Sequence, residues 1–557
     1  MKITVVLCTF LILFCAGSAF SQTYANLFNE EDLRSTVKFL SGDGFEGRAP
    51  GSRGGELAAK YIAHRLELAG IKPGNNGSYF QPVSLIGLKP DPKTVLYVSR
   101  KTDDKTFGFA FGKDFVGFTD AQNSDVTVEG DLVFAGYGID APEQNWNDYK
   151  GDASRYKDKI LMILVNDPPA TEAEPDLFGG KALTYYGRWT YKYEESARKG
   201  AKGVILVHTD ESAGYGWNVV ETSFGGTERF DIARTENDTT PFLQLKAWMR
   251  DSSIMEFIKF ASSTSGKSLR GMMEDAKSRD FQPVELNTRV KINLKADLHK
   301  VDSNNVVGIW EGSDPKLKDE YVVHTAHWDH LGVGKPNAKG DTIYNGALDN
   351  ASGVSQIIAM AKAFTKLPKD QQPKRSQVFL FTTAEEQGLL GAEWYAKHPI
   401  FPHEKTAANL NIDGGNFFGK TTNYGALGAE RSSLDEIVFD ELKKRSMTYM
   451  PDNRPEQGSF FRSDHFPFAK MGVPALSIRS GNDFIGKEKG WADKFFEEYN
   501  KNNYHQPSDE FDEKWQFDGM VQMLDVTFGI AMRVSNAPKL QAFKQGDEFA
   551  KAQPNRK

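Results

Sequence analysis

The strongest constraint on the fold of this chain is a series of short apolar runs beyond residue 300. The runs are 305–310, 321–326, 377–381 and 408–412, and a segment with helical spacing, 353–364, lies between the second and the third. Strands that alternate with helices in this way are typical of a parallel sheet with helices on both faces. We therefore predict a three-layer α/β/α domain with a mostly parallel central sheet. In such sheets, binding sites form at the carboxyl ends of the strands.

The first 21 residues have a different character. A basic residue precedes an apolar run over residues 3–16, which is too short to span a bilayer, and small residues follow it. This pattern predicts a signal peptide with cleavage after Ser21, and hence a secreted or periplasmic protein. A lipid anchor at Cys15 is a weaker alternative, because the bulky Phe14 precedes it.

The cysteines limit the chemistry of any metal site. Both of them, Cys8 and Cys15, lie in the predicted signal peptide, so cleavage would leave a mature chain without a thiol. Disulfides are then excluded even in an oxidising compartment. A zinc site would have to be built from histidine and carboxylate side chains.

Composition excludes several classes of partner. The chain of 557 residues is 39% hydrophobic and 26% charged, and its net charge is −7. These values are ordinary for a globular protein, and they provide no basic surface for nucleic acid. We expect no nucleic-acid partner and no membrane span in the mature chain. Nothing in the sequence indicates an oligomeric state.

Residues 125–265 have a different texture from the rest. Short apolar strands at 132–134, 159–165 and 203–208 stand between glycines and prolines, which predicts an inserted, β-rich domain. His208 ends the last of these strands alone, and we interpret it as a structural residue. The expected organisation is a signal peptide (1–21), N-terminal helices and strands of the main domain (22–124), the insert (125–265), the rest of the main domain (266–540) and a polar tail (541–557).

Histidine and acidic residues stand where the strands of the main domain end. His327 closes the strand 321–326, Glu385 and Glu386 follow 377–381, and Asp413 follows 408–412. Two more candidates, Asp349 before a predicted helix and His505 in a later loop, complete the set. Each residue alone has an ordinary explanation as a helix cap, a turn residue or an exposed loop residue. Because the carboxyl ends of parallel strands meet at one edge of a sheet, their coincidence predicts that they converge.

The set that fits best is two histidines and three carboxylates around two zinc ions: His327, Asp349, Glu386, Asp413 and His505. Three carboxylates and one bridging hydroxide balance the charge of two Zn²⁺ ions, as a partly buried site requires. Metal ions in such pairs lower the pKa of a shared water toward neutrality. An attacking hydroxide would then form without a protein nucleophile.

The order of these motifs resembles the M28 family of zinc aminopeptidases over residues 30–535. The segments that carry the resemblance are Ala-His-Trp-Asp-His-Leu-Gly around His327, Leu-Asp-Asn-Ala-Ser-Gly around Asp349, Ala384 to Gly391, Asn411-Ile412-Asp413, Ser463 to Ala475, and Tyr504-His505. The resemblance implies a zinc-exopeptidase fold with two zinc ions. The insert in turn resembles a protease-associated domain, a module found within several exopeptidases.

The resemblance also implies a role for each residue. Asp349 bridges the two ions, His327 and Asp413 complete one, and Glu386 and His505 complete the other. Glu385 is the implied general base, and Tyr504 is the implied hydrogen-bond donor to the carbonyl oxygen. These two roles suit the chemistry, since hydrolysis needs a group that moves a proton and a group that stabilises the developing oxyanion.

Two further residues are expected to support the site. Asp329, two residues after His327, is placed to orient its imidazole. His465 is interpreted as a structural or supporting residue, because the ligand set is already full.

The function predicted is that of a secreted di-zinc aminopeptidase, in which a metal-bridging hydroxide attacks the N-terminal peptide bond and Glu385 is the general base. Its substrates would be peptides with a free N-terminus. A zinc carboxypeptidase of the same superfamily is one alternative, with Arg454, Arg462 or Arg479 holding a C-terminal carboxylate. A non-catalytic, receptor-like binding protein is another, but such a protein is expected to lack ligands or the base.

Overall fold

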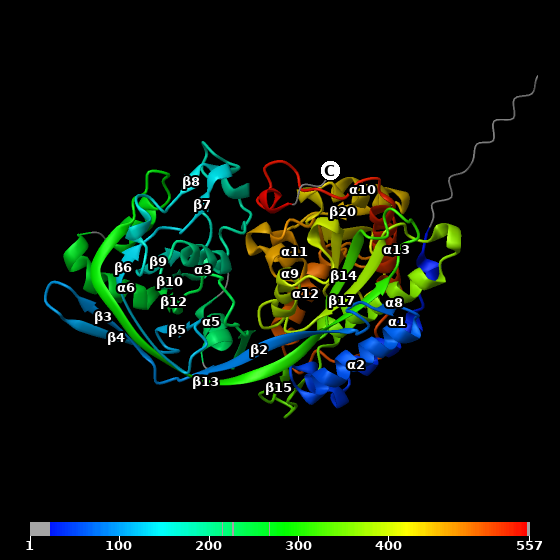
Figure 1. The fold of residues 1–557 in the computed structure, drawn as a ribbon, viewed down its shortest axis with the longest axis horizontal. Coiled ribbons are helices and arrows are strands. Elements are labelled where there is room, and N and C mark those ends of the chain that lie inside the picture. Colours follow the sequence, from blue (N-terminus) through cyan, green and yellow to red (C-terminus); the bar gives the residue numbers. More distant parts are fainter. Residues whose placement is uncertain (1–22, 214–215, 226–227, 267, 554–557) are drawn as a thin grey trace, which may run out of the picture.

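The structure is a computed structural model that describes residues 23–213, 216–225, 228–266 and 268–553. The predicted signal peptide lies outside the described residues. Figure 1 shows two lobes joined by two long strands, β2 (Phe80–Pro90) and β13 (Val284–Trp310). Among the described residues, no helix combines the length and the apolarity needed to cross a membrane.

The larger lobe is built on a sheet whose four central strands are parallel. In spatial order these are β17 (Ser376–Thr382), β14 (Tyr321–His327), β18 (Thr406–Ile412) and β21 (Ala475–Ser480). Antiparallel strands flank them: the C-terminal part of β13 pairs with β17, and β19 (Asn423–Leu427) pairs with β21 and also with β20 (Thr448–Met450). The predicted α/β class with a mostly parallel sheet is confirmed.

Alternating side chains of the central strands serve two different cores. In β14, Val322 packs against one face with the helices α1 (Glu30–Leu40), α2 (Arg53–Leu68), α8 (Ser352–Lys366), α10 (Leu434–Lys444) and α13 (Asp518–Asn536). Its neighbour Val323 packs on the other face with Tyr395 and Phe468 of α9 (Leu390–Lys397) and α11 (His465–Lys470). This period of two buries both faces of the sheet and produces three layers.

The smaller lobe has its own sheet and its own hydrophobic core. Its strands, in spatial order, are β4 (Thr106–Ala110), β3 (Val95–Arg100), the N-terminal part of β13, β6 (Asp125–Phe134), β9 (Ile160–Leu164), β10 (Gly203–His208), β12 (Leu245–Arg250) and β5 (Phe115–Phe118). Its α-helices are α3 (Trp189–Arg198), α4 (Asp210–Ala213), α5 (Trp217–Phe224), α6 (Asp251–Ser265) and α7 (Leu269–Asp275). The smaller lobe therefore folds around a sheet rather than around isolated hairpins.

The boundaries of the smaller lobe differ from those expected from the sequence. Residues 22–124 were assigned to the main domain, but β3, β4 and β5 pair within the second sheet. At the other end, the expected boundary at 265 falls short, because residues 284–295 of β13 pair with β6. Backbone pairing thus places the insert at about 95–295. The composition change near residue 125 marked only the start of its most apolar strands.

The C-terminal segment is not a solvated tail. The side chains of Phe543 and Phe549 are buried in a cluster with Phe466 and other aromatic residues of the larger lobe. Glu548 accepts hydrogen bonds from Arg431 and from the backbone N–H of Tyr185, which belongs to the smaller lobe. The segment therefore contacts both lobes, and in Figure 1 its red ribbon lies between them.

A buried histidine in β14 couples folding to pH. His324 lies next to Gln377, with Nε2 2.9 Å from Oε1, and stacks on Phe379 at 5.4 Å between ring centroids. Burial lowers the pKa of His324 to about 4. The unfolded chain takes up a proton at this residue below about pH 6.5, whereas the folded chain does not until about pH 4. Its stabilising contribution is therefore present above pH 6.5 and is lost as the pH falls toward 4.

We expect His324 to account for about 2–3 kcal/mol of the stability lost between pH 7.5 and pH 4.5. Urea unfolding of the wild type and of His324→Gln at both pH values measures this. The destabilisation caused by the substitution should shrink, or reverse, at the lower pH. An equal difference between the two proteins at both pH values would contradict the assignment.

Candidate metal centre and active site

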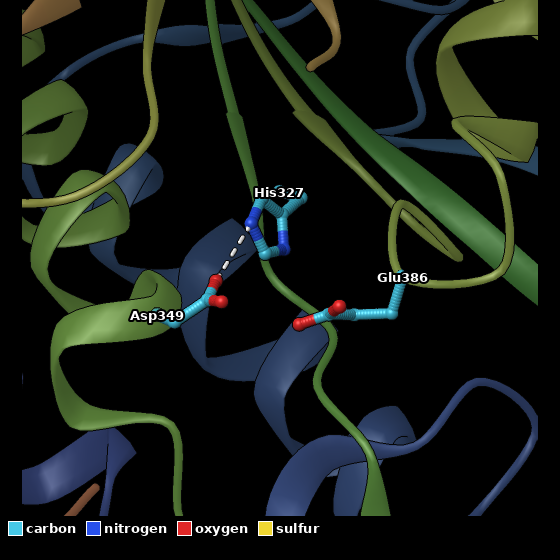
Figure 2. Close-up of side chains that lie close together, drawn as sticks. All are labelled: His327, Asp349 and Glu386. Carbon is cyan, nitrogen blue, oxygen red and sulfur yellow. Dashed lines mark ion pairs between the residues drawn. The ribbon is translucent and has the colours of Figure 1, made fainter. Parts of the chain in front are cut away.

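Side chains from separate elements meet at the carboxyl ends of the central strands. His327 is the last residue of β14, Glu385 and Glu386 follow β17, and Asp413 follows β18. Asp349 lies in the turn before α8. His505 comes from the loop between α12 (Trp491–Asn502) and α13. Figure 2 shows Asp349 and Glu386 reaching toward His327 from opposite sides.

The distances among the five expected ligands divide them into two groups that share one carboxylate. His327 Nε2 lies 3.2 Å from Asp349 Oδ1 and 3.1 Å from Asp413 Oδ1. His505 Nε2 lies 2.9 Å from Glu386 Oε2 and 3.5 Å from Asp349 Oδ2. Asp349 therefore directs one oxygen toward each histidine. Two ligand atoms on one tetrahedral zinc ion would lie about 3.3 Å apart, so each group is spaced as the ligands of one ion would be.

The charge of the cluster also suits a cation site. Four carboxylates, those of Asp349, Glu385, Glu386 and Asp413, crowd around the two histidines. The side chain of Glu386 is only 4% exposed. Buried like charges are costly unless a cation neutralises them. The donor set of imidazole nitrogens and carboxylate oxygens fits zinc, and the residues present therefore fit a pair of zinc ions.

Glu385 lies beside the five expected ligands, but it forms neither of the close histidine–carboxylate pairs described above. One of its oxygens comes within 4.8 Å of atoms of His327 and Asp413. Burial raises the pKa of Glu385 well above its ordinary value; the charges of Asp413 and Glu386 raise it further, and His327 opposes them. A carboxyl group with a raised pKa beside a metal site has the properties of a proton carrier.

Hydrogen bonds from distant residues hold the ligand loops in place. Asp509 accepts the backbone N–H groups of Leu348 and Asp349, each at 3.0 Å. Asn350 Oδ1 accepts the N–H of Gly414 at 3.0 Å and so ties the Asp349 turn to the Asp413 loop. A side chain at Gly353 would meet Asn350 Oδ1 at 2.3 Å, so glycine is required there. These bonds fix the backbone that carries the two carboxylates.

Two functional residues escaped the sequence reasoning. His330 Nδ1 lies 2.6 Å from Glu386 Oε1, opposite the Glu386 oxygen that faces His505. Its place three residues after His327, in the same motif, was the available signal. Arg48 is buried and donates hydrogen bonds to the carbonyls of Trp328, Asn345 and Gly346. No local pattern pointed to Arg48, because its partners lie about 280–298 residues away.

The other three residues expected at the site, Asp329, Tyr504 and His465, differ in how close they lie to the ligands. The carbonyl of Asp329 lies 3.2 Å from His327 Nδ1, but its carboxylate accepts the N–H of Glu385 at 3.1 Å. Asp329 thus joins the histidine to the loop of the expected base. Tyr504 stacks on His505 at 3.8 Å between ring centroids and lines the same cavity as Glu385. His465 is buried against Phe460 and contacts none of the five ligands, and burial lowers its pKa to about 3, so its ring is neutral.

The cluster opens into a cavity of about 830 Å³ that both lobes line. The larger lobe contributes Glu385, Tyr504 and His505, and the smaller lobe contributes Phe118 and Trp189 among other residues. A cavity of this size is in the range of small-ligand sites. A substrate that reaches the cluster is therefore surrounded by side chains of both lobes.

Comparison with known proteins places this site in a family. Residues 305–528 match the model of peptidase family M28. The matched segment contains the five expected ligands together with Glu385 and Tyr504. Residues 305–528 are therefore similar to peptidase family M28. Because the match begins after the smaller lobe, this similarity rests on the larger lobe alone.

The relatives match only part of this chain. Aminopeptidase YwaD from Bacillus subtilis (strain 168) is 26% identical over 268 residues, which are 46% of this chain and 50% of that protein. The vacuolar membrane protease of Emericella nidulans is 32% identical over 170 residues, 28% of this chain and 15% of that protein. The chain thus spans half or less of the length of these curated relatives. A solved aminopeptidase from Aneurinibacillus sp. strain AM-1 is 16% identical, with a TM-score of 0.49 and coverage of 92% of this chain and 96% of that one.

The two adjacent glutamates, Glu385 and Glu386, are expected to differ in what they do for the metal. Glu386 lies within ligand spacing of His505, so Glu386→Gln should lower zinc content. Glu385 lies beside the ligand groups, so Glu385→Gln should keep zinc. Metal analysis of the purified variants by mass spectrometry, with chelator titration, measures this. Equal loss of zinc from both variants would contradict the assignment.

Proposed function

We propose that the protein is a zinc-dependent aminopeptidase that removes N-terminal residues from peptides. The observation that carries the proposal is the spacing of the five ligand-type side chains around Asp349, with Glu385 beside them in a cavity between two lobes. The similarity of residues 305–528 to family M28 and the name of the relative YwaD, an aminopeptidase, support it. Both groups of ligands are complete, which favours two ions.

Asp349 would share its carboxylate between the two ions, with His327 and Asp413 on one side and Glu386 and His505 on the other. Bound zinc supplies Lewis acidity, since it lowers the pKa of water and polarises a carbonyl group. His330 and Ser463 would keep the ligands Glu386 and Asp413 in orientation through their hydrogen bonds of 2.6 and 2.7 Å. Such supporting contacts tune metal affinity.

Glu385 would take the proton from the attacking water and return it to the leaving amine. Its raised pKa suits proton uptake, and nearby cations would lower that pKa toward the working range of a general base. Tyr504 would donate its hydroxyl to the carbonyl oxygen. Burial and the carboxylates around it, Asp349 first, raise the pKa of Tyr504, which keeps the hydroxyl protonated as a donor.

The smaller lobe would restrict the site to chain ends. Its side chains form part of the cavity wall, and they would narrow the path by which a polypeptide reaches the cluster. We propose that this lobe is the protease-associated domain that its sequence resembles. An exopeptidase needs a closed end of this kind, because it must measure the distance from a terminus to the scissile bond.

A zinc carboxypeptidase is the second candidate. Arg454, Arg462 and Arg479, which the sequence suggested as a carboxylate clamp, line the same cavity. Peptides with a free amine and their N-acetylated forms separate the two activities, since acetylation abolishes aminopeptidase cleavage and spares carboxypeptidase cleavage. A receptor-like protein without catalysis is disfavoured, because the ligand groups and the base are all present.

We expect the enzyme to hydrolyse aminoacyl p-nitroanilides, to lose activity with a chelator and to regain it with added zinc. Glu385→Gln should lower kcat by at least about 100-fold, because the proton no longer has a carrier. Initial rates measured on zinc-loaded protein check this.

Asp493→Asn is the matched control for the Glu385 test. Asp493 is an exposed carboxylate that lines the same cavity, so its substitution also removes one negative charge there. Its kcat should stay close to that of the wild type. Near-full activity of zinc-loaded Glu385→Gln would remove Glu385 from the mechanism.

We also propose that the protein is exported with cleavage after Ser21, as the apolar run over residues 3–16 indicates. Expression of the full chain with a C-terminal tag, followed by N-terminal sequencing of the extracytoplasmic fraction, tests this. The expected first residue is Gln22. Retention of the intact N-terminus in the cytoplasmic fraction would contradict the proposal.

A further inference from the structure

Three arginines gather on one wall of the cavity, on the Asp413 side of the metal cluster. Arg479 lies near the end of β21, Arg462 directly precedes Ser463, and Arg454 lies in the loop that follows β20. They come from three separate segments of the larger lobe. Their meeting in one place is therefore a product of the fold and not of a basic run in the sequence.

These guanidinium groups differ from three other basic side chains that line the cavity. Lys246 is paired with Asp120 at 2.6 Å, Arg234 with Asp238 at 3.4 Å, and Lys470 with Glu194 at 3.5 Å. Among the described residues, the side chains of Arg454, Arg462 and Arg479 form no ion pair and no hydrogen bond. We call these three residues the arginine wall. Its N–H groups are therefore free to donate hydrogen bonds to a ligand.

The arginines also influence one another. The pKa of Arg479 is lowered, first by burial and also by the charges of Arg462 and Arg454, while Asp452 and Asp413 oppose the shift. Asp413 is already engaged by His327 and by Ser463, whose hydroxyl donates to Oδ2 at 2.7 Å. Asp452 accepts the backbone N–H of Arg454. Positive charge therefore exceeds negative charge on this wall.

The position of the arginine wall relates it to the reacting bond. β21 lies beside β18 in parallel, with Ile478 opposite Ile412, so the next residues along the two strands are Arg479 and Asp413. Ser463, the neighbour of Arg462, is in hydrogen-bond contact with Asp413. A substrate group bound by the arginines would thus lie about one residue away from the peptide bond held at the metal cluster.

We propose that Arg454, Arg462 and Arg479 form a subsite for a carboxylate of the peptide substrate. The proposal rests on the function proposed above and adds the substrate class, namely peptides that carry a carboxylate next to the scissile bond. That carboxylate belongs either to the side chain of an acidic N-terminal residue or to the C-terminus of a short peptide. Guanidinium groups bind carboxylates with two parallel hydrogen bonds, which supplies both affinity and geometry.

Two substrate comparisons distinguish the sources of the carboxylate. Glutamyl p-nitroanilide against glutaminyl p-nitroanilide tests the side chain, since the two differ in charge and hardly in size. Leucyl-glycine against leucyl-glycinamide tests the C-terminus. In one of the two pairs, we expect kcat/KM to be at least about 10-fold higher for the substrate that carries the carboxylate. Hydrogen bonds to a charged group contribute enough free energy for a difference of this size.

Substitutions connect that preference to the arginine wall. In Arg479→Gln and Arg462→Gln, the preference ratio should fall by about 10- to 100-fold. Arg479→Lys keeps the positive charge but loses the paired N–H donors of the guanidinium group, so it should retain only part of the preference ratio. Lys397→Gln is the matched control, because it removes one positive charge from the same cavity away from the wall and should leave the ratio unchanged.

The same design separates failure of the subsite from failure of the proposed function. Hydrolysis of leucyl p-nitroanilide without a carboxylate preference in either pair would overturn the subsite and leave the function standing. If no substrate is hydrolysed, the function fails. Calorimetry on zinc-loaded Glu385→Gln then decides the subsite, with Glu-Ala against Gln-Ala and leucyl-glycine against leucyl-glycinamide. Equal binding within both pairs overturns it, and tighter binding of the carboxylate that Arg479→Gln abolishes supports it.

Discussion

The register of the parallel strands β17, β14 and β18 is the constraint on which the site depends. Thr382 lies opposite His327, so the residues that follow β17 emerge beside the end of β14. Since side chains alternate between the faces of a strand, a shift by one residue would turn His327 into the core and remove the ligand. The apolar alternation of Val322 and Val323 between two cores prevents such a shift. The packing of the sheet thus fixes the position of the metal site.

Charge is the second constraint, and it explains why the supporting residues are so many. Carboxylates held close together repel one another, so a loop that carries one tends to move away. Asp509 opposes this by holding the backbone of Asp349, and Arg48 by binding the carbonyls of Asn345 and Gly346 in the same turn. These bonds hold the backbone around Asp349 in one conformation, and a ligand held in this way costs less to order when it binds an ion.

Local patterns in the sequence predicted those features of the structure that depend on neighbouring residues. Short continuous apolar runs located the strands, and the polar residues at their ends located the set around His327. The patterns failed where contacts are long-range. Residues 305–310 read as a separate strand, yet they form the end of β13, whose two halves pair in different sheets. The burial of Phe549 depends in the same way on partners about 80 residues away, which no pattern within the tail reveals.

The cavity between the lobes brings these constraints together. Its metal end follows from the strand register, whereas its walls depend on how the smaller lobe is held by β2, β13 and the C-terminal segment. Most charged groups on those walls are paired, so they contribute little selectivity for a charged substrate. The arginine wall is different because, within the part of the chain that the structure describes, its three side chains form no ion pair. Unpaired arginines beside a reacting centre keep a permanent attraction for anions, and a substrate carboxylate can satisfy them without displacing an existing ion pair.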